Sequence, residues 1–248
     1  MPEGPEVRLQ ADLLQRVVGS TIHGARVVSG RYLRKPITGL DELAGSRITA
    51  INNHGKLIYF ALDGKRYIHS TLGMSGSWEA ENLKHTRISL TLSKSTIHYH
   101  DPRNFGTLKI VSAAEHQEKL SLLGPDFSKP LDESVTTEIE RRLSSYGSGC
   151  IAQSLLDQRI FCGIGNYLRA DALYLAKINP HALKLSKRSL KNLVLRCIEL
   201  SSLAYLERES YEFIIYKRRI SKLGNPIVSE LIGPRRIWWC PVEQVNLT

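Results

Sequence analysis

The spacing of apolar residues changes along this chain, and the changes divide it into regions. From Val7 to Val18 apolar residues recur at helical spacing, which predicts an amphipathic helix. From about Thr21 to Val111 short apolar or alternating runs predict an antiparallel β-sandwich. The runs are 48–51, 57–62, 67–69, 88–92, 97–99 and 107–111, and Asp63-Gly64 between two of them is typical of a hairpin turn.

Helical spacing returns after Leu123-Gly124-Pro125-Asp126 and predicts helices over 135–143, 151–156, 166–176 and 186–205. From Phe213 to Val245 short apolar runs at 213–216, 226–228 and 237–239, which we interpret as strands, stand among basic side chains. We therefore predict an α+β multidomain protein. Its parts are an N-terminal antiparallel β-sandwich with an N-terminal helix (1–127), a helical domain (128–210) and a β-hairpin unit (211–248).

Composition and charge predict the kind of partner and the cellular location of the protein. The chain has 248 residues and a formal charge of +10, which favours a polyanion such as nucleic acid as partner. No apolar run approaches the length needed to span a bilayer, and no signal peptide opens the sequence. We expect an intracellular protein, in the nucleus of a eukaryote or in the cytoplasm and nucleoid of a bacterium. Its four cysteines form no C-x-x-C pair, which argues against a disulfide framework.

The first residues, Pro2-Glu3-Gly4-Pro5-Glu6, carry the candidate chemistry. Removal of Met1 would leave Pro2 with a free secondary amine, and an α-amino group titrates near about 8 whereas a lysine titrates near about 10.4. Such an amine can form a Schiff base, and Glu3 can supply the proton that a leaving group needs. An ordinary helix start, with Pro5 and Glu6 at favoured positions, explains the same pentapeptide equally well.

Loops of the predicted sandwich hold further candidates, each with a plain structural alternative. Lys56 follows a glycine turn and can bind a phosphate or simply lie in solvent. Met74 lies between Gly73 and Gly76, where a methionine is a wedge if exposed and core if buried. Residues 101–106 are predicted to form a tight turn that carries Arg103 and Phe105 two positions apart. On an extended segment that spacing means the same face, and such side chains can enter a base stack.

A glycine turn precedes the predicted helix at Asn166. The sequence Gly163-Ile164-Gly165-Asn166 leaves backbone N–H groups at the positive end of a helix, where an anion such as phosphate is favoured. A helix pair with an Asn cap is the alternative.

Taken in order, these segments resemble the family of formamidopyrimidine-DNA glycosylase and endonuclease VIII over essentially the whole chain. The motifs are 2–6, 55–56, 73–76, 101–106, 156–158 with 163–166, and 235–244. The resemblance implies a β-sandwich domain, a helical domain with a helix-two-turn-helix, and DNA bound in the cleft between them. It also implies a base-excision-repair enzyme whose partner is damaged double-stranded DNA. We expect a monomer that does not associate with a membrane.

The resemblance assigns the chemistry to the first residues. Pro2 would attack C1′ of the damaged nucleoside, Glu3 would protonate the opening sugar, and Glu6 would be a supporting acid. The Schiff base then acidifies the sugar α-protons, so that β- and δ-elimination cleave the strand after base release.

DNA-binding roles are implied for the loop residues. Lys56 and Asn166 would bind phosphates near the lesion. Met74, Arg103 and Phe105 would fill the gap left by the flipped-out base, with Arg103 facing the orphaned base.

The end of the chain departs from the family pattern, which has a four-cysteine zinc finger. The four ligand positions correspond here to Ile220, Leu223, Cys240 and Glu243, which cannot hold a structural zinc ion. We expect a zincless finger, held by packing of Ile237, Trp238 and Trp239, with Arg235 at the place of the finger's DNA-contacting arginine. No cofactor or metal is therefore predicted.

Other departures bear on the substrate. Asn104 replaces an arginine usual in the formamidopyrimidine branch, the stretch 206–211 is short for the loop that caps oxidised purines there, and Asn166-Tyr167-Leu168-Arg169 is similar to endonuclease VIII. These features favour oxidised pyrimidines and ring-opened or hydantoin lesions. The alternatives are an enzyme that prefers 8-oxoguanine and formamidopyrimidines, a non-catalytic protein that binds damaged DNA, and an RNA- or ribosome-binding protein.

Overall fold

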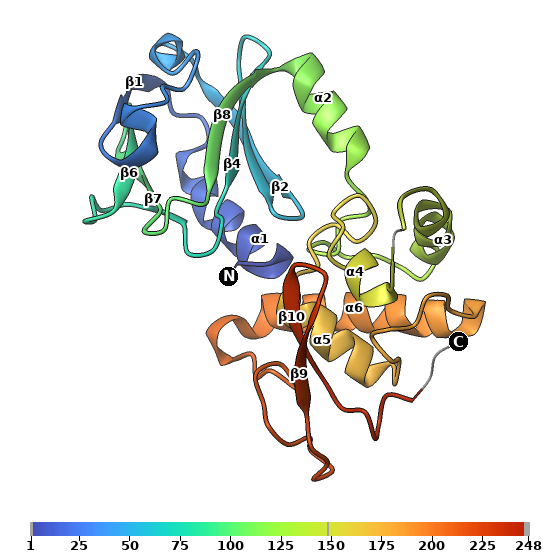
Figure 1. The fold of residues 1–248 in the computed structure, drawn as a ribbon. Coiled ribbons are helices and arrows are strands. Elements are labelled where there is room, and N and C mark those ends of the chain that lie inside the picture. The colour runs from blue at the N-terminus through green and yellow to red at the C-terminus, as the bar shows by residue number, and fades with distance from the viewer. Residues whose placement is uncertain (1, 148, 246–248) are drawn as a thin grey trace. The chain divides into compact units, whose positions relative to one another are not determined.

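A computed structural model describes residues 2–147 and 149–245 (Figure 1). The chain divides into two compact units. Unit 1 contains Pro2 and Glu6–Ser121; unit 2 contains Glu3–Pro5 and the residues from Leu122 onward. The predicted division at 127/128 and 210/211 stays a prediction.

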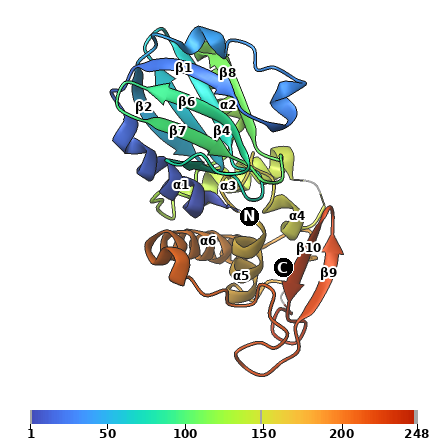
Figure 2. The same ribbon diagram turned by 90° about the vertical axis from the view of Figure 1, so that its left-hand side faces the viewer.

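Unit 1 consists of two antiparallel four-stranded sheets, in the orders β1-β6-β7-β5 and β2-β3-β4-β8, with helices at the two ends of the unit's sequence (Figures 1 and 2). Phe60 and Trp78, from different sheets, lie with ring centroids 5.2 Å apart in the shared core. The elements are α1 (Gly4–Leu13), η1 (Leu14–Val17), β1 (Ile22–Val27), η2 (Gly30–Leu33), η3 (Asp41–Leu43), β2 (Ile48–His54), β3 (Leu57–Leu62), β4 (Arg66–Thr71), β5 (Ser77–Glu79), β6 (Thr86–Leu92), β7 (Thr96–His100), β8 (Thr107–Ser112) and α2 (Ala113–Leu122).

Unit 2 is mainly helical and ends in a two-stranded hairpin. Apolar side chains of its helices and of the hairpin form one core, because the buried Ile232 and Ile237 of the hairpin join the helical residues. The elements are α3 (Val135–Tyr146), α4 (Ile151–Ser154), α5 (Asn166–Leu175), α6 (Lys187–Glu207), η4 (Arg208–Ser210), β9 (Val228–Ile232) and β10 (Arg235–Trp239). The predicted α+β class, with a sandwich followed by a helical part, is confirmed.

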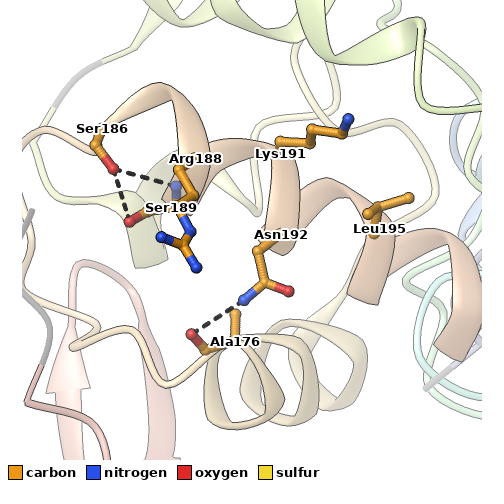
Figure 3. Close-up of a pocket in the computed structure, with 7 residues that line it drawn as sticks. All are labelled: Ala176, Ser186, Arg188, Ser189, Lys191, Asn192 and Leu195. Atoms are coloured by element: carbon orange, nitrogen blue, oxygen red, sulfur yellow. Dashed lines mark hydrogen bonds between the residues drawn. The ribbon is translucent and has the colours of Figure 1, made fainter.

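The start of α6 lines an open pocket of about 710 Å³ (Figure 3). Ser186 caps the helix, since its hydroxyl oxygen accepts the N–H of Ser189 at 3.2 Å. Asn192 donates to the Ala176 carbonyl at 3.4 Å and so ties α6 to the end of α5.

Some local predictions were wrong. Residues 213–216 form no strand, because their backbone N–H groups bond to a buried carboxylate of α5 rather than to another strand. Helix α2 was not predicted. It covers β4 through His116, whose Nδ1 lies 2.8 Å from Nε2 of His69, and burial together with that neighbour lowers the pKa of His69 to about 4. The N-cap of α5 is Gly165 rather than Asn166.

Among the described residues, no helix is both long and apolar enough to cross a membrane.

Candidate functional site

Three of the sequence motifs lie at one end of a single sheet in unit 1. In the register of that sheet Leu57 pairs with Thr71, and Thr71 pairs with Thr107. Lys56, the loop after Thr71 and the loop before Thr107 therefore emerge together. The sheet brings Lys56, Met74, Arg103 and Phe105 to the same edge of the unit.

Two glycines allow the two longer loops to touch. A Cβ on Gly73, which has φ +60°, would lie 2.5 Å from the backbone nitrogen of Gly106. A Cβ on Gly106 would lie 1.9 Å from the hydroxyl of Tyr99. Any larger residue at either position would push the loops apart. Met74, which directly follows Gly73, is half-buried and is not part of the core.

The Asp101–Gly106 loop presents an exposed aromatic ring. Asp101 is buried, and its Oδ2 accepts the N–H of Gly106 at 2.8 Å, which closes the turn. Asn104 has φ +60°, so the segment is a tight turn, as the sequence predicted, and Arg103 and Phe105 are not related by the alternation of an extended strand. Phe105 is 55% exposed, and the guanidinium carbon of Arg103 lies 5.0 Å from its ring centroid.

Two arginine side chains hydrogen-bond to the backbone of this loop. Buried Arg87 donates to the carbonyls of Asp101 (2.7 Å) and Pro102 (3.1 Å) and to the Ser29 hydroxyl (2.9 Å). Arg31, from η2, donates to the carbonyls of Asn104 (3.2 Å) and Gly106. Charged donors make stronger hydrogen bonds than neutral ones, so the backbone of the loop is well fixed.

Lys56 follows Gly55 in the turn between β2 and β3. The side-chain amide of Asn53 donates to the Gly55 carbonyl at 3.2 Å, which stabilises that turn. Pro2 and Glu6 belong to unit 1 and are partly accessible. Met1, whose removal the amine hypothesis requires, lies outside the described residues.

Glu3 belongs to unit 2, where it caps a helix. Its side chain is 1% exposed, and its two oxygens accept the backbone N–H groups of Tyr167 (2.9 Å) and Leu168 (3.3 Å) in the first turn of α5. The positive end of the helix dipole stabilises such an anion. The anion that these N–H groups bind is thus Glu3, whereas the sequence suggested a phosphate for this helix end.

The glycine turn before α5 leaves room for that carboxylate. A Cβ on Gly165 would lie 2.2 Å from the carboxyl carbon of Glu3, and the Gly4 N–H donates to the Gly163 carbonyl at 2.8 Å. Gln158 holds the turn from the other side, because its amide donates to the Ile164 carbonyl (3.0 Å) and accepts from the Gly163 N–H (3.0 Å).

Asn166 is joined to the hairpin rather than left open. Its amide donates to the Arg236 carbonyl at 2.9 Å. The fully buried Arg169 donates to Asn166 Oδ1 (2.5 Å) and to the same carbonyl (3.1 Å). Burial lowers the pKa of Arg169 to about 10, partly offset by the charge of Glu3, so this guanidinium remains protonated at neutral pH.

The hairpin separates its two arginines. Arg235 pairs with Ile232 across the ladder and, by alternation, shares a face with the buried Ile237. Arg236 lies on the other face, where it donates to the Ser229 carbonyl at 2.8 Å. Trp238 lies on the Arg236 face and contacts Tyr216, with centroids 4.7 Å apart.

A carboxylate, Glu243, stands at one of the four positions that the sequence resemblance compared with zinc ligands. Glu243 accepts hydrogen bonds from Tyr174 (2.7 Å), Lys177 (3.1 Å), Asn225 (3.1 Å) and Ser221. Burial would raise its pKa, but these donors outweigh burial and lower it to about 2.

The other three positions compared with zinc ligands do not form a metal site here. Ile220 and Leu223 are 61% and 72% exposed, and Cys240 is buried with its Sγ 3.6 Å from Glu243 Oε1. Within 2–147 and 149–245, no group of three His, Cys, Asp or Glu side chains is placed to hold a metal ion. That the protein binds no zinc stays a prediction.

Asp171 binds the backbone within residues 213–216, which were predicted to form a strand. It is fully buried and accepts the N–H groups of Ile214 (3.0 Å), Ile215 (2.9 Å) and Tyr216 (3.1 Å). Burial raises its pKa, and these hydrogen bonds oppose that shift.

Four charged residues shape these sites in ways that were not predicted from the sequence, although Arg169 was named there as part of a motif. Arg169 and Asp171 carry a visible signal, since they stand in the apolar sequence Leu168 to Leu173, where a charge is expected to be buried and bonded. For Arg31 the signal is weaker: residues 13–40 contain five Lys or Arg and no Asp or Glu. Nothing in the sequence distinguishes Arg87 from an exposed strand residue.

Comparison with known proteins agrees with this arrangement. Residues 1–108 match the family model described as the formamidopyrimidine-DNA glycosylase N-terminal domain. The chain is 30% identical to formamidopyrimidine-DNA glycosylase of Thermus thermophilus over 98% of each chain. It is also 30% identical to endonuclease 8 of Pectobacterium atrosepticum, covering 97% of this chain and 98% of the relative.

Solved structures agree as well. The crystal structure of the MutM (Fpg) protein from Thermus thermophilus matches with a TM-score of 0.83 and 28% identity over 99% of each chain. A structure of MutM in complex with DNA containing carbocyclic 8-oxo-G matches with a TM-score of 0.82 and 26% identity, over 98% of this chain and 99% of the other. The chain therefore belongs to the formamidopyrimidine-DNA glycosylase and endonuclease VIII family of DNA glycosylases.

Proposed function

We propose that this protein is a bifunctional DNA glycosylase and AP lyase of base excision repair, acting on oxidised bases in duplex DNA. The observation that carries the proposal is Glu3. It is a buried carboxylate held by the N-terminus of α5 and covalently adjacent to Pro2, the residue with the candidate amine.

The chemistry follows from these two neighbours. In the resting state both Glu3 oxygens accept N–H bonds, so the carboxylate must gain a proton before it can donate one. An α-ammonium group, with a pKa near about 8, is a suitable source. Transfer of a proton from the Pro2 ammonium to Glu3 produces the nucleophile and the acid in one step.

The Pro2 nitrogen attacks C1′ and the C1′–base bond breaks. The attacking nitrogen becomes positively charged and loses its N–H proton, which goes to the departing base. The C1′–O4′ bond opens, O4′ takes the proton of Glu3, and an iminium ion links Pro2 to C1′. Loss of a C2′ proton expels the 3′ phosphate, and δ-elimination then expels the 5′ phosphate. Glu6 supports the acid–base steps.

The remaining residues bind DNA in this proposal. Lys56 lies at the end of a sheet and Arg235 lies on the hairpin, and we assign both as cations that bind phosphates. Asn166 would exchange its bond to the Arg236 carbonyl for one to a phosphate, or donate its second amide hydrogen. Met74, Arg103 and Phe105 fill the space of the everted base, which the exposure of Phe105 supports.

We further propose a preference for oxidised pyrimidines and ring-opened or hydantoin lesions. Helix α6 continues directly into η4, and Asp171 fixes residues 214–216, so only residues 211–213 lie between η4 and the anchored backbone. A short connection leaves less protein to enclose a bulky purine.

Borohydride trapping tests the mechanism. The purified protein is incubated with duplexes that carry an abasic site, thymine glycol, a hydantoin or 8-oxoguanine, and its N-terminus is sequenced. We expect a covalent adduct on chains that begin at Pro2, ranked with thymine glycol and the hydantoin above 8-oxoguanine. Chains that retain Met1 are the matched control and should not be trapped, because the Pro2 nitrogen is then an amide.

Pro2→Gly should excise bases much more slowly and bind DNA with nearly unchanged affinity. Equal excision by this variant and the wild type would rule out the proline. Binding without an adduct, despite a free Pro2, would instead identify a non-catalytic protein that recognises DNA damage.

A further inference from the structure

A basic surface in unit 1 adjoins the Asp101–Gly106 loop. Residues Gly30–Lys35, here called the η2 segment, contain Arg31, Arg34 and Lys35. They lie within the acid-free stretch 13–40 of the chain. Arg34 and Lys35 are exposed, and neither forms an ion pair within the part of the chain that the structure describes.

The η2 segment and the loop are built as one piece. Arg31 donates from the segment to the Asn104 and Gly106 carbonyls of the loop, and Arg87 bonds to Ser29 on one side and to Asp101 and Pro102 on the other. Gly30 permits the contact, since a Cβ there would lie 2.8 Å from Cδ of Arg87 and 2.9 Å from Oδ1 of Asn104. A ligand bound to the η2 segment would therefore lie at a fixed distance from Phe105.

A pocket of about 480 Å³ opens between them. Its lining is Gly30, Arg31, Leu33, Arg34, Lys35 and Asn104. Three of these six residues are cations and none is an acid, so the pocket favours an anion.

The pocket at the start of α6 shows the contrast (Figure 3). It also has basic residues in its lining, but Lys191 there is paired with Glu133 at 2.9 Å. Lys191 is thus balanced from within the protein, whereas Arg188 of the same lining forms no ion pair within the part of the chain that the structure describes. In the η2 pocket the charge of Arg34 and Lys35 is left for an external partner.

We propose that the η2 pocket binds a phosphodiester group of the DNA backbone through Arg34 and Lys35, next to the place where Phe105 enters the duplex. This rests on the proposed DNA-directed function. The pocket positions the duplex against the loop, because Arg31 and Arg87 fix the distance between the bound phosphate and the aromatic ring.

The salt dependence of DNA binding tests this proposal. Affinity for a duplex with an uncleavable abasic-site analogue is measured by fluorescence anisotropy over a range of salt concentrations. For the double variant Arg34→Gln/Lys35→Gln, we expect the slope of log affinity against log salt to become shallower by about 0.9 per lost phosphate contact. The affinity at moderate salt should fall roughly tenfold.

Arg26→Gln is the matched control, since Arg26 is an exposed cation of β1 in the same acid-free stretch and outside the pocket lining. Its slope should equal that of the wild type. An unchanged slope in the double variant, or an equal change in the control, would overturn the pocket. Thermal unfolding midpoints verify that all variants are folded.

Two further measurements distinguish a DNA phosphate from free phosphate, and the pocket from the enzyme. Titration with inorganic phosphate by calorimetry should show millimolar binding or weaker; tight phosphate binding that the double variant loses without any change in DNA affinity would contradict a DNA contact. Borohydride trapping of the wild type is run in parallel. A wild type that binds with the expected slope but is not trapped refutes the proposed enzyme and leaves the pocket standing.

Discussion

The Asp101–Gly106 loop and the segments that flank the hairpin β9–β10 are both short pieces of chain, but side chains of opposite charge hold them. Behind the loop, Arg31 and Arg87 donate to backbone carbonyls. Beside the hairpin, the Glu243 carboxylate accepts from side chains of two separate segments, 174–177 and 221–225.

The two arrangements fix different things. Donors to carbonyls fix the shape of a backbone turn, and they do so whatever side chains the turn carries. An acceptor shared by side chains fixes the attachment of one segment to another. Loop shape and hairpin attachment can therefore be disturbed independently.

The largest loss of stability is expected from Arg87→Met. The change leaves the Asp101 and Pro102 carbonyls without their donor in a buried place, which costs about 2–4 kcal/mol. Urea unfolding of the variant measures the loss. Arg87→Lys should recover part of it, and Arg26→Met, an exposed change in β1, should lie within about 0.5 kcal/mol of the wild type. A small effect of Arg87→Met would mean that the loop holds its shape without the arginine.

Glu243→Ala should cost somewhat less, about 1–3 kcal/mol, because water can reach part of the exposed donors that it abandons. The effect should be local. Hydrogen exchange should accelerate in residues 219–227 and in the hairpin, and remain unchanged in the Asp101–Gly106 loop. Glu199→Ala removes the partner of an exposed arginine, Arg196, and serves as the control with little effect. Faster hydrogen exchange in the Asp101–Gly106 loop would show that the two regions are not independent.

A pH titration sharpens the same contrast with a smaller effect. The pKa of Glu243 is lowered to about 2 in the folded protein from 4.5. A depressed pKa means that its stabilisation is present above about pH 4.5 and is lost as the pH falls towards about 2. The stability difference between the wild type and Glu243→Gln should therefore shrink over that range. A difference that does not depend on pH would exclude the charge of Glu243 as the cause.

The smallest change in stability is expected from Phe105→Ala, within about 0.5 kcal/mol, because the ring is largely exposed. Excision from duplex DNA should nevertheless fall by roughly tenfold or more, since nothing then replaces the everted base in the stack. Single-turnover kinetics and thermal unfolding on the same sample measure both. Loss of stability without loss of excision would assign the ring to packing.

The fold was readable from the sequence where a residue pattern reports its own neighbourhood. Alternation over 88–92 and the Asp63-Gly64 turn placed strands of the sandwich correctly, because both depend on residues next to one another. Helix α2 was missed, since its burial depends on His116 meeting His69, which is 47 residues away in sequence.

The candidate site was partly readable for the same reason. Motif residues such as Lys56 and Phe105 were named, and the sheet register that brings them together follows from pairing of remote strands. An anion at the start of α5 was predicted in kind, and two of the N–H groups there bind the Glu3 carboxylate. A helix end announces that it attracts negative charge, but its sequence does not say that Glu3, from the other end of the chain, supplies it.

Asp171 has a consequence for protein engineering. By clamping the backbone at 214–216, it divides the connection between α6 and the hairpin into two stretches that end at a fixed point. Extra residues inserted before that point would not transmit strain to the hairpin beyond it. The stretch 208–211 is thus a grafting site, where a longer loop taken from a relative could broaden the range of lesions while the rest of unit 2 stays in place.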